Sequence, residues 1–541
     1  MNKKVFLFCT GSEWVITLMA GAAATGLTAP WWIDISLWIG VFPALTVATG
    51  FHFVFAARRI PPIPHIGIVI CCLQYGLAPW LAYYYPPDDV MTDRYGISDY
   101  GLYFSYVGPL AVAFALGWLL PLLGYGGTVL APPLDPELRG RVVSELDLIF
   151  WVGMGATLLA NYWYAGSLAF FLLLLGNLRF VGAIGHMILG TRGWIWRIAV
   201  LLLLETYAAV GSGMFHSLLL WGAAIGAFYA CFRRVSRTVL FSAGIAGILL
   251  LFALQHTKWK IRQATWFGAS RTVLVFDQEI ELTPFSQPLV GALCITEGMW
   301  RTLKWDWDRD FVSGTVLRYN QGWIINKVLH HVPEVEPYAR GETLWTGVTS
   351  SLLPRFLAPG KHISGGKIPM LRFTGLSLGE ETSMNLGFGG EMYANFGLWG
   401  GVLACGLYAL VLGMAFLFVA LRARVSVLWW FFVPYVGHWA LKAESGIPDV
   451  MNFMVKSSLV LLAVVVVSPG LRHLMLRSLR RGPALPFSPR FHRPPNLSQP
   501  AHQTGSAKLI LETSVPGQCV LPNSDFTPPF DGGAGERPAA G

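Results

Sequence analysis

Residues that could bind or transform a ligand are concentrated in one stretch of the chain, from about residue 255 to residue 397. This stretch combines Arg, Lys, Glu, Asn and Gly with many aromatic residues, whereas the sequence on either side is mostly apolar. A bundle of membrane helices does not need such a segment in order to be stable in lipid. We therefore expect this insert to carry the function.

The motif RYNQGW, at residues 318–323, combines groups that suit an anionic sugar ligand. Arg318 offers a planar guanidinium suited to a phosphate or a carboxylate. Asn320 and Gln321 offer amide hydrogen-bonding groups. Tyr319 and Trp323 offer ring faces, and amides beside aromatic faces suit sugar rings. Alternatively, the two rings anchor a helix of about residues 315–331 along the membrane interface.

The motif LLPRFLAPGK, at residues 352–361, places Arg355 and Lys361 among Pro and Gly residues, which favours a fixed loop. Cations also occur throughout the rest of the insert. As a group they indicate a phosphate-bearing ligand. Each one taken singly is also consistent with an exposed ion pair.

The motif GFGGEMYANFG, at residues 387–397, places Glu391, Tyr393 and Asn395 directly after three glycines. Glycine has no side chain and so permits a ligand to approach the backbone closely. The alternative is that Glu391 is simply an acidic residue favoured by the dipole at a helix N-terminus. Glu381 is a second candidate carboxylate in the same region.

Two ionisable residues lie inside apolar runs: Arg179 in GNLRF and Glu205 in LLLLET. Such groups are costly in hydrocarbon and usually face a partner or a wet cavity. Their comparable depth on adjacent antiparallel helices predicts that they pair. The sequence is consistent with two interpretations of these residues: a structural ion pair, and a contact to the substrate.

The elements that must position these residues are membrane helices. Of the 541 residues, 54% are hydrophobic and 13% are charged, where a soluble domain has about 25% charge. The mean hydropathy is +0.52, and apolar runs of about 20 residues recur. The sequence therefore predicts an all-α polytopic membrane protein, with about twelve transmembrane helices and a large external loop between the ninth and the tenth.

This pattern divides the chain into four parts. Residues 1–254 form the first nine helices, 255–390 the external loop, 391–470 the last three helices, and 471–541 a basic and then Pro-rich tail. The tail has few bulky apolar residues and is expected to be disordered. The first apolar run is interpreted as an uncleaved span, with a signal peptide as the alternative.

The basic residues of the short connections set the orientation, because cytoplasmic loops of membrane proteins are enriched in them. With twelve spans, they all fall on one side: Lys3 and Lys4, Arg58 and Arg59, Arg139 and Arg141, Arg192 and Arg197, Arg233, Arg234 and Arg237, Arg422 and Arg424, and the run from Arg472 to Arg481. Both termini are then cytoplasmic. The insert is external, which means periplasmic in a Gram-negative bacterium.

The same observations argue against two other kinds of ligand. The net charge of +9 comes mainly from these connections and the start of the tail, so nucleic acid is not expected as a partner. Among the seven cysteines no pair has the spacing of a zinc site, and only Cys294 lies in the insert. We expect neither a structural metal nor a disulfide within the insert.

The three motifs, GNLR at residues 176–179 and a long external loop between late spans together resemble bacterial oligosaccharide repeat-unit polymerases of the O-antigen polymerase (Wzy) type. The resemblance implies an inner-membrane glycosyltransferase that needs no metal or cofactor. Such an enzyme moves a growing surface glycan or exopolysaccharide from a polyprenyl diphosphate to the next lipid-linked repeat unit. The implied partners are polyprenyl-diphosphate-linked oligosaccharide, membrane lipid, and chain-length regulator and flippase proteins.

For that reaction, Arg318 and Arg355 are expected to stabilise the departing diphosphate, together with Lys361. Glu391 is the expected base for the attacking hydroxyl, with Glu381 in reserve. The remaining expected contacts to the substrate are Tyr319, Asn320, Gln321, Trp323, Tyr393, Asn395 and Arg179.

Two other functions are consistent with the same sequence. One is a related transfer, by a polysaccharide ligase or a polyprenyl-phosphate-sugar glycosyltransferase. The other is not enzymatic: a transporter or flippase for lipid-linked sugars, or a component of an export complex. Transporters often show half-repeats and broken helices at the membrane midplane, and neither is visible in this sequence.

Overall fold

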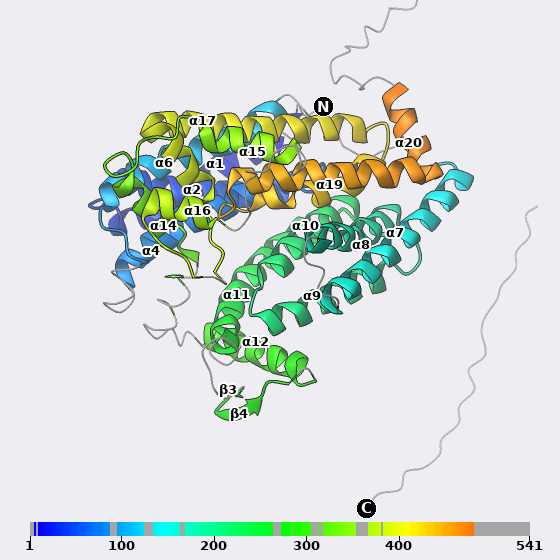
Figure 1. The fold of residues 1–541 in the computed structure, drawn as a ribbon, viewed down its shortest axis with the longest axis horizontal. Helices are drawn as coiled ribbons and strands as arrows, with labels where there is room; N and C mark the ends of the chain where they lie inside the picture. Colours follow the sequence, from blue (N-terminus) through cyan, green and yellow to red (C-terminus); the bar gives the residue numbers. More distant parts are fainter. Residues whose placement is uncertain are drawn as a thin grey trace, which may run out of the picture. The chain divides into compact units, whose positions relative to one another are not determined.

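The computed structural model describes residues 5–6, 9–86, 95–123, 134–162, 168–262, 272–283, 285–304, 312, 316–317, 319–352, 366–379 and 382–480. The chain divides into two units, Met1–Phe487 and Ser488–Gly541, and the second lies outside the described residues. The first unit is all-α, as predicted, apart from two short antiparallel ribbons, β1 (Val5–Phe6) with β2 (Cys9–Thr10) and β3 (Thr272–Val275) with β4 (Gln278–Glu281) (Figure 1).

Every predicted span coincides with a helix. These helices are α1 (Gly11–Thr28), α2 (Val41–Ala56), α3 (Ile63–Cys72) continued by a π-helical turn (Leu73–Leu77) and α4 (Ala78–Tyr84), α6 (Tyr100–Leu119), α7 (Pro136–Tyr162), α8 (Ala169–Leu189), α9 (Trp194–Ser212), α10 (His216–Phe232), α11 (Arg237–Arg262), α17 (Gly387–Ala423), α18 (Leu428–Gly437) and α19 (Ile447–Val467). Within the described residues, nine helical stretches are long and apolar enough to cross a membrane. Helices α1, α10 and α18 are not among them, so the number twelve stays a prediction.

The insert contributes two groups of elements that pack on different parts of the bundle (Figure 1). The ribbon β3–β4 leads into α12 (Gln287–Leu303), and α12 packs on α9 and α11. Helix α14 (Gly322–His331) packs on α6 and α17, α15 (Glu342–Leu352) on α19, and α16 (Lys367–Thr374) on α14. Helix α11 continues to Arg262 and α17 begins at Gly387, and the predicted boundaries of the external loop stay predictions.

Helix α14 is enclosed by other helices. The side chains of Trp323, Ile325 and Val328 are at most 4% exposed. A helix lying along a membrane surface would present one face to lipid over its length. The alternative prediction, that a helix of about residues 315–331 lies along the membrane interface, is therefore wrong for α14. The apolar residues of α14 belong to the core.

Basic connections meet at one end of the bundle. Glu13, at the start of α1, accepts hydrogen bonds from Arg59, at 3.0 Å, and from Arg237. Arg139 and Arg233 donate to carbonyl oxygens in the last turn of α8, at 3.0 and 3.1 Å. The connections that contain these arginines thus lie on the same side, as the charge pattern predicts. Which compartment this side faces stays a prediction. The last described helix, α20 (Pro469–Arg480), follows α19 at this end.

The orientation can be tested by labelling introduced thiols. Val335 in the insert is 70% exposed, whereas Ser350, also in the insert, is only 6% exposed. In a Cys519→Ser background, we expect Val335→Cys to react with an impermeant maleimide when only the outer membrane is permeabilised. Glu137→Cys, beside Arg139 at the basic end, should react only after the inner membrane is broken. The opposite pattern would reverse the assigned orientation.

Candidate functional site

The predicted site residues fall into four groups. Arg318, Arg355, Lys361 and Glu381 lie outside the described residues, so their roles stay predictions. The others lie around the start of α14, in the first turns of α17 and in the middle of α8.

At the start of α17, the glycines are packed against protein side chains. A Cβ atom at Gly387, where φ is +69°, would lie 2.5 Å from the Tyr75 hydroxyl. A Cβ at Gly389 would lie 3.0 Å from Ile325 of α14. We expected these glycines to admit a ligand, but the structure fills the space with Tyr75 and Ile325. Their absent side chains instead let α17 pack closely on α14 and the π-helical turn.

Glu391 follows these glycines and is 3% exposed. Its Oε2 atom accepts the N–H of Ile447, the first residue of α19, at 2.7 Å. Its Oε1 atom accepts no hydrogen bond from the described part of the chain. The N-terminus of α19 both holds the carboxylate in place and favours its negative charge. One oxygen is therefore fixed by α19, while the Thr343 side chain also interacts with this carboxylate.

Asn395 and Tyr393 hold the first turns of α17 against the insert. The Asn395 Oδ1 accepts the N–H of Gly341 at 2.9 Å, and its Nδ2 donates to the Thr343 hydroxyl at 2.7 Å and to the Glu391 carbonyl at 2.8 Å. Tyr393 is 7% exposed and packs edge-on against other tyrosine rings. In this structure Asn395 bonds to the backbone of Glu391 and Tyr393 packs among tyrosines, and their expected contacts to a glycan stay predictions.

The segment Gly387–Phe396 is set apart from the rest of α17 by a break at Gly397 (φ 71°, ψ −164°). A Cβ atom at Gly397 would lie 3.1 Å from the ring of Tyr338, in the insert. A positive φ is unfavourable for residues other than glycine. Gly397 therefore lets the Glu391 segment turn away from the long apolar part of α17 that follows it.

A chain of polar contacts joins the start of α14 to the start of α19. The Gln321 N–H donates to the Gln74 carbonyl at 3.2 Å, and the Gln74 side chain donates to Glu444 at 3.5 Å. Glu444 precedes the Ile447 that binds Glu391 by three residues. The motifs RYNQGW and GFGGEMYANFG are therefore parts of one polar region, organised around the π-helical turn. Turns of this kind are frequent at functional sites.

The two aromatic residues of RYNQGW are mainly packing residues in this structure. Trp323 is 4% exposed and meets Tyr95 edge-on, with 4.9 Å between ring centroids. The hydroxyl of Tyr319 donates to the Leu251 carbonyl at 3.2 Å. Burial raises the pKa of Tyr319 to about 12, so this phenol stays protonated at neutral pH. Contacts from these rings to a sugar stay predictions.

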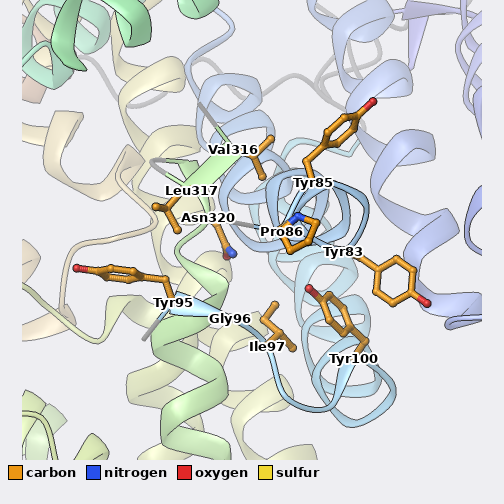
Figure 2. Close-up of a pocket in the computed structure, with 11 residues that line it drawn as sticks. Tyr83, Tyr85, Pro86, Tyr95, Gly96, Ile97, Tyr100, Val316, Leu317 and Asn320 are labelled. Carbon is orange, nitrogen blue, oxygen red and sulfur yellow. The ribbon is translucent and has the colours of Figure 1, made fainter. Parts of the chain in front are cut away.

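Asn320 lies at a cavity of about 170 Å³ between the start of α14 and the connection from α4 to α6 (Figure 2). Its lining is mostly apolar and includes four tyrosines, Tyr83, Tyr85, Tyr95 and Tyr100. The sequence analysis missed these tyrosines. The available signal was the clustering of tyrosines on both sides of the short connection at residues 85–100.

Some cations of the insert are already paired with protein carboxylates. Arg372 makes a bidentate contact with Glu342, at 2.9 and 3.0 Å, and also binds Glu336. The hydrogen bonds from Arg372 lower the pKa of Glu342. Lys260 binds Glu297 at 2.6 Å. Both Arg372 and Lys260 are therefore paired within the protein, and a phosphate contact is not needed to explain them. The pairs of Arg372 are partly exposed, whereas that of Lys260 is largely buried.

The predicted pair within the membrane helices is confirmed. Arg179 of α8 donates to Glu205 of α9 and to the Thr157 hydroxyl of α7, and Ser217 donates to the second oxygen of Glu205 at 3.0 Å. Both charged side chains are 9% exposed. This pairing explains how the two charges are tolerated there. A substrate contact by Arg179 stays a prediction.

The pair predicts a non-additive effect of mutation. Removing one partner leaves a buried charge unpaired, which costs about 3 to 5 kcal/mol, whereas replacing both with apolar residues is often far milder. We therefore expect Arg179→Leu and Glu205→Leu each to lower the unfolding temperature of purified protein more than the double variant does. Arg301→Leu, which removes a more exposed partner of Glu297, is the control and should have a smaller effect. A double variant as unstable as the sum of the single ones would contradict the coupling.

Comparison with known proteins finds no relative: no family model, no curated protein and no solved structure matches this chain. Among the described residues, His, Cys, Asp and Glu side chains nowhere gather in threes that could hold a metal ion. The resemblance to repeat-unit polymerases therefore rests on the sequence motifs alone. The structure adds the geometry of the described part of those motifs.

Proposed function

We propose that this protein is a polymerase of bacterial inner membranes that joins polyprenyl-diphosphate-linked oligosaccharide repeat units by glycosyl transfer. One observation carries the proposal beyond the motifs: the distribution of buried amide and carboxylate oxygens that accept no hydrogen bond. Six buried amide or carboxylate oxygens in the described part of the chain accept no hydrogen bond, those of Gln74, Gln255, Asn320, Asn326, Glu391 and Asn452.

All six oxygens belong to the end of the bundle that carries the insert. Asn320 and Asn326 are in the insert, Gln74 contacts it, and Gln255 is near the end of α11 that leads into it. Asn452 lies, like the partner of Glu391, near the start of α19. Buried oxygens without a donor are costly, and such groups in a native structure call for an explanation. A ligand rich in hydroxyl groups supplies the missing donors, and oligosaccharides are such ligands.

The position of this region suits a substrate that is anchored in lipid. A polyprenyl diphosphate holds its chain in the membrane, its diphosphate at the level of the headgroups and its sugars in water. The polar region lies where the apolar helices α4, α6, α17 and α19 begin or end and where α14 and α15 pack on them. A glycan held there remains close to its membrane anchor.

In the proposed reaction, a sugar hydroxyl of one lipid-linked unit attacks the anomeric carbon of the growing chain. A carbon–oxygen bond forms there, and the bond to the polyprenyl diphosphate breaks. Oε1 of Glu391 takes the proton of the attacking hydroxyl. Arg318, Arg355 and Lys361 stabilise the charge on the departing diphosphate; their assignment comes from the sequence.

The role of Glu391 can be tested without disturbing its structural bond. In Glu391→Gln, the amide oxygen can still accept the N–H of Ile447, but the side chain no longer takes a proton. We expect chain growth from purified lipid-linked repeat units to fall by about 100-fold or more at matched folded protein. The control, Glu334→Gln, makes the same change at an exposed residue of the insert and should not alter the rate. Growth by Glu391→Gln at the wild-type rate would reject the base assignment.

The same assay tests the expected diphosphate site. Arg318→Ala and Arg355→Ala should each slow chain growth, because a cation that stabilises developing charge contributes to the rate. Arg340→Ala, at an exposed arginine of the insert, is the control for loss of one positive charge. Undiminished growth by both Arg318→Ala and Arg355→Ala would reject their assigned role.

Lipid-linked intermediates in a deletion strain distinguish the proposed polymerase from the alternatives. Loss of a polymerase should cause single repeat units to accumulate on the external face of the membrane. Loss of a ligase would instead leave finished chains on their lipid carrier, and loss of a flippase would leave single units on the cytoplasmic face. Either of these last two results would overturn the proposed function.

A further inference from the structure

We propose that the tyrosine-lined cavity beside Asn320 binds a single pyranose ring of the glycan. The cavity lies between the end of α4, the start of α6 and the start of α14 (Figure 2). This inference rests on the proposed function, because it names where one sugar of that substrate is held. It concerns a different set of residues from those assigned to the chemical step.

The size of the cavity suits one six-membered ring. Its volume is about 170 Å³. A cavity of about 150 Å³ in another protein accommodates benzene, so there is room for one ring and little more. Tyr83 and Tyr85 are 48% and 39% exposed, so the lining reaches the protein surface and a ligand can enter from there.

The lining matches the two kinds of surface that a pyranose presents. Tyr83 packs edge-on against Tyr100, and Tyr95 edge-on against Trp323, with centroid distances of 5.1 and 4.9 Å. These contacts fix the orientation of the rings. In Figure 2 the ring of Tyr100 points toward the space beside Asn320, whereas those of Tyr83, Tyr85 and Tyr95 point away from it. The Tyr100 ring is therefore the one placed to pack on the C–H face of a sugar. Its hydroxyl group can bond to the hydroxyls at the rim of the sugar.

Asn320 supplies the polar group that a sugar needs inside the cavity. It is 1% exposed, its Oδ1 atom has no donor among the described residues, and its amide points toward the space between the labelled side chains (Figure 2). A hydroxyl both donates and accepts, so it can pair with either end of this amide. Ligand pockets of this kind are mostly apolar, with a few polar groups that fix orientation.

Other parts of the same substrate fit the cavity less well. A prenyl chain would fill the apolar lining but would leave the Asn320 oxygen buried without a donor, which is unfavourable. A diphosphate would bring acceptor oxygens to an acceptor oxygen, and among the described residues no cation contributes to the lining. A neutral sugar ring satisfies both the apolar and the polar part of the cavity.

Binding can be measured directly with saturation-transfer NMR on the full-length protein in lipid nanodiscs, which avoids glycoside detergents. The probes are methyl pyranosides of glucose, galactose, mannose, rhamnose and N-acetylglucosamine. We expect saturation to be transferred from the protein to the ring protons of at least one of these pyranosides. Inorganic diphosphate should not compete with that pyranoside for binding. Loss of one hydrogen bond in Asn320→Leu should weaken binding by about ten-fold. Tyr83→Ala should also weaken pyranoside binding. Because the ring of Tyr83 is exposed, this variant does not remove a buried side chain.

The control is Tyr229→Ala, the same change at a tyrosine of α10 that is 41% exposed and outside the cavity. It should bind as the wild type does. Absence of transfer to every probe, displacement by diphosphate, or unchanged binding in both cavity variants would overturn the inference. These results are independent of the polymerase assay: chain growth without pyranoside binding rejects the cavity alone, whereas specific binding without chain growth rejects the polymerase alone.

Discussion

The hydroxyl of Tyr75 joins three segments on which the candidate site depends. It donates to the Ala443 carbonyl just before α19 and accepts the N–H of Gly389 in α17 at 3.3 Å. The carbonyl of Tyr75 in turn accepts the hydroxyl of Tyr103 in α6 at 2.8 Å. Tyr75 is 1% exposed, so these bonds are made without competition from water.

These contacts explain why the glycines and the π-helical turn occur together. The π-helical turn at residues 73–77 redirects the helix at Tyr75, and the absence of a side chain at Gly387 and Gly389 leaves room for its ring. A substitution of Gly389 would therefore displace α17 from both Tyr75 and Ile325. Since Glu391 is only two residues further along α17, its position relative to Ile447 depends on this packing.

Local sequence patterns predicted the helices and the Arg179–Glu205 pair, because both follow from properties of short segments. Apolar runs of sufficient length specify membrane helices, and two charges at similar depth in such runs have few possible partners. The division of the insert could not be predicted in this way. Whether α12 packs on α11 and α14 on α17 depends on contacts between segments far apart in the chain.

The same limit applies to individual site residues. Glu391 could be identified as a candidate from its neighbours, but its bond to Ile447 joins residues 56 positions apart. The cavity beside Asn320 likewise combines residues from 82–86 and 95–100 with residues 316, 317 and 320. A single motif does not reveal which tyrosines will face a distant amide. The clustering of tyrosines indicated the region, and the fold determined the partner.

The buried ionisable groups differ in a way that separates structural from chemical roles. Arg179 and Glu205 neutralise each other, and both oxygens of Glu205 accept hydrogen bonds. Such a pair has a structural role, because loss of either partner would leave an unpaired charge in an apolar environment. Glu391 has one oxygen bound to a backbone N–H and one without a donor. A proton delivered to that free oxygen leaves the bond to Ile447 in place, so this carboxylate can change its charge while α19 stays docked.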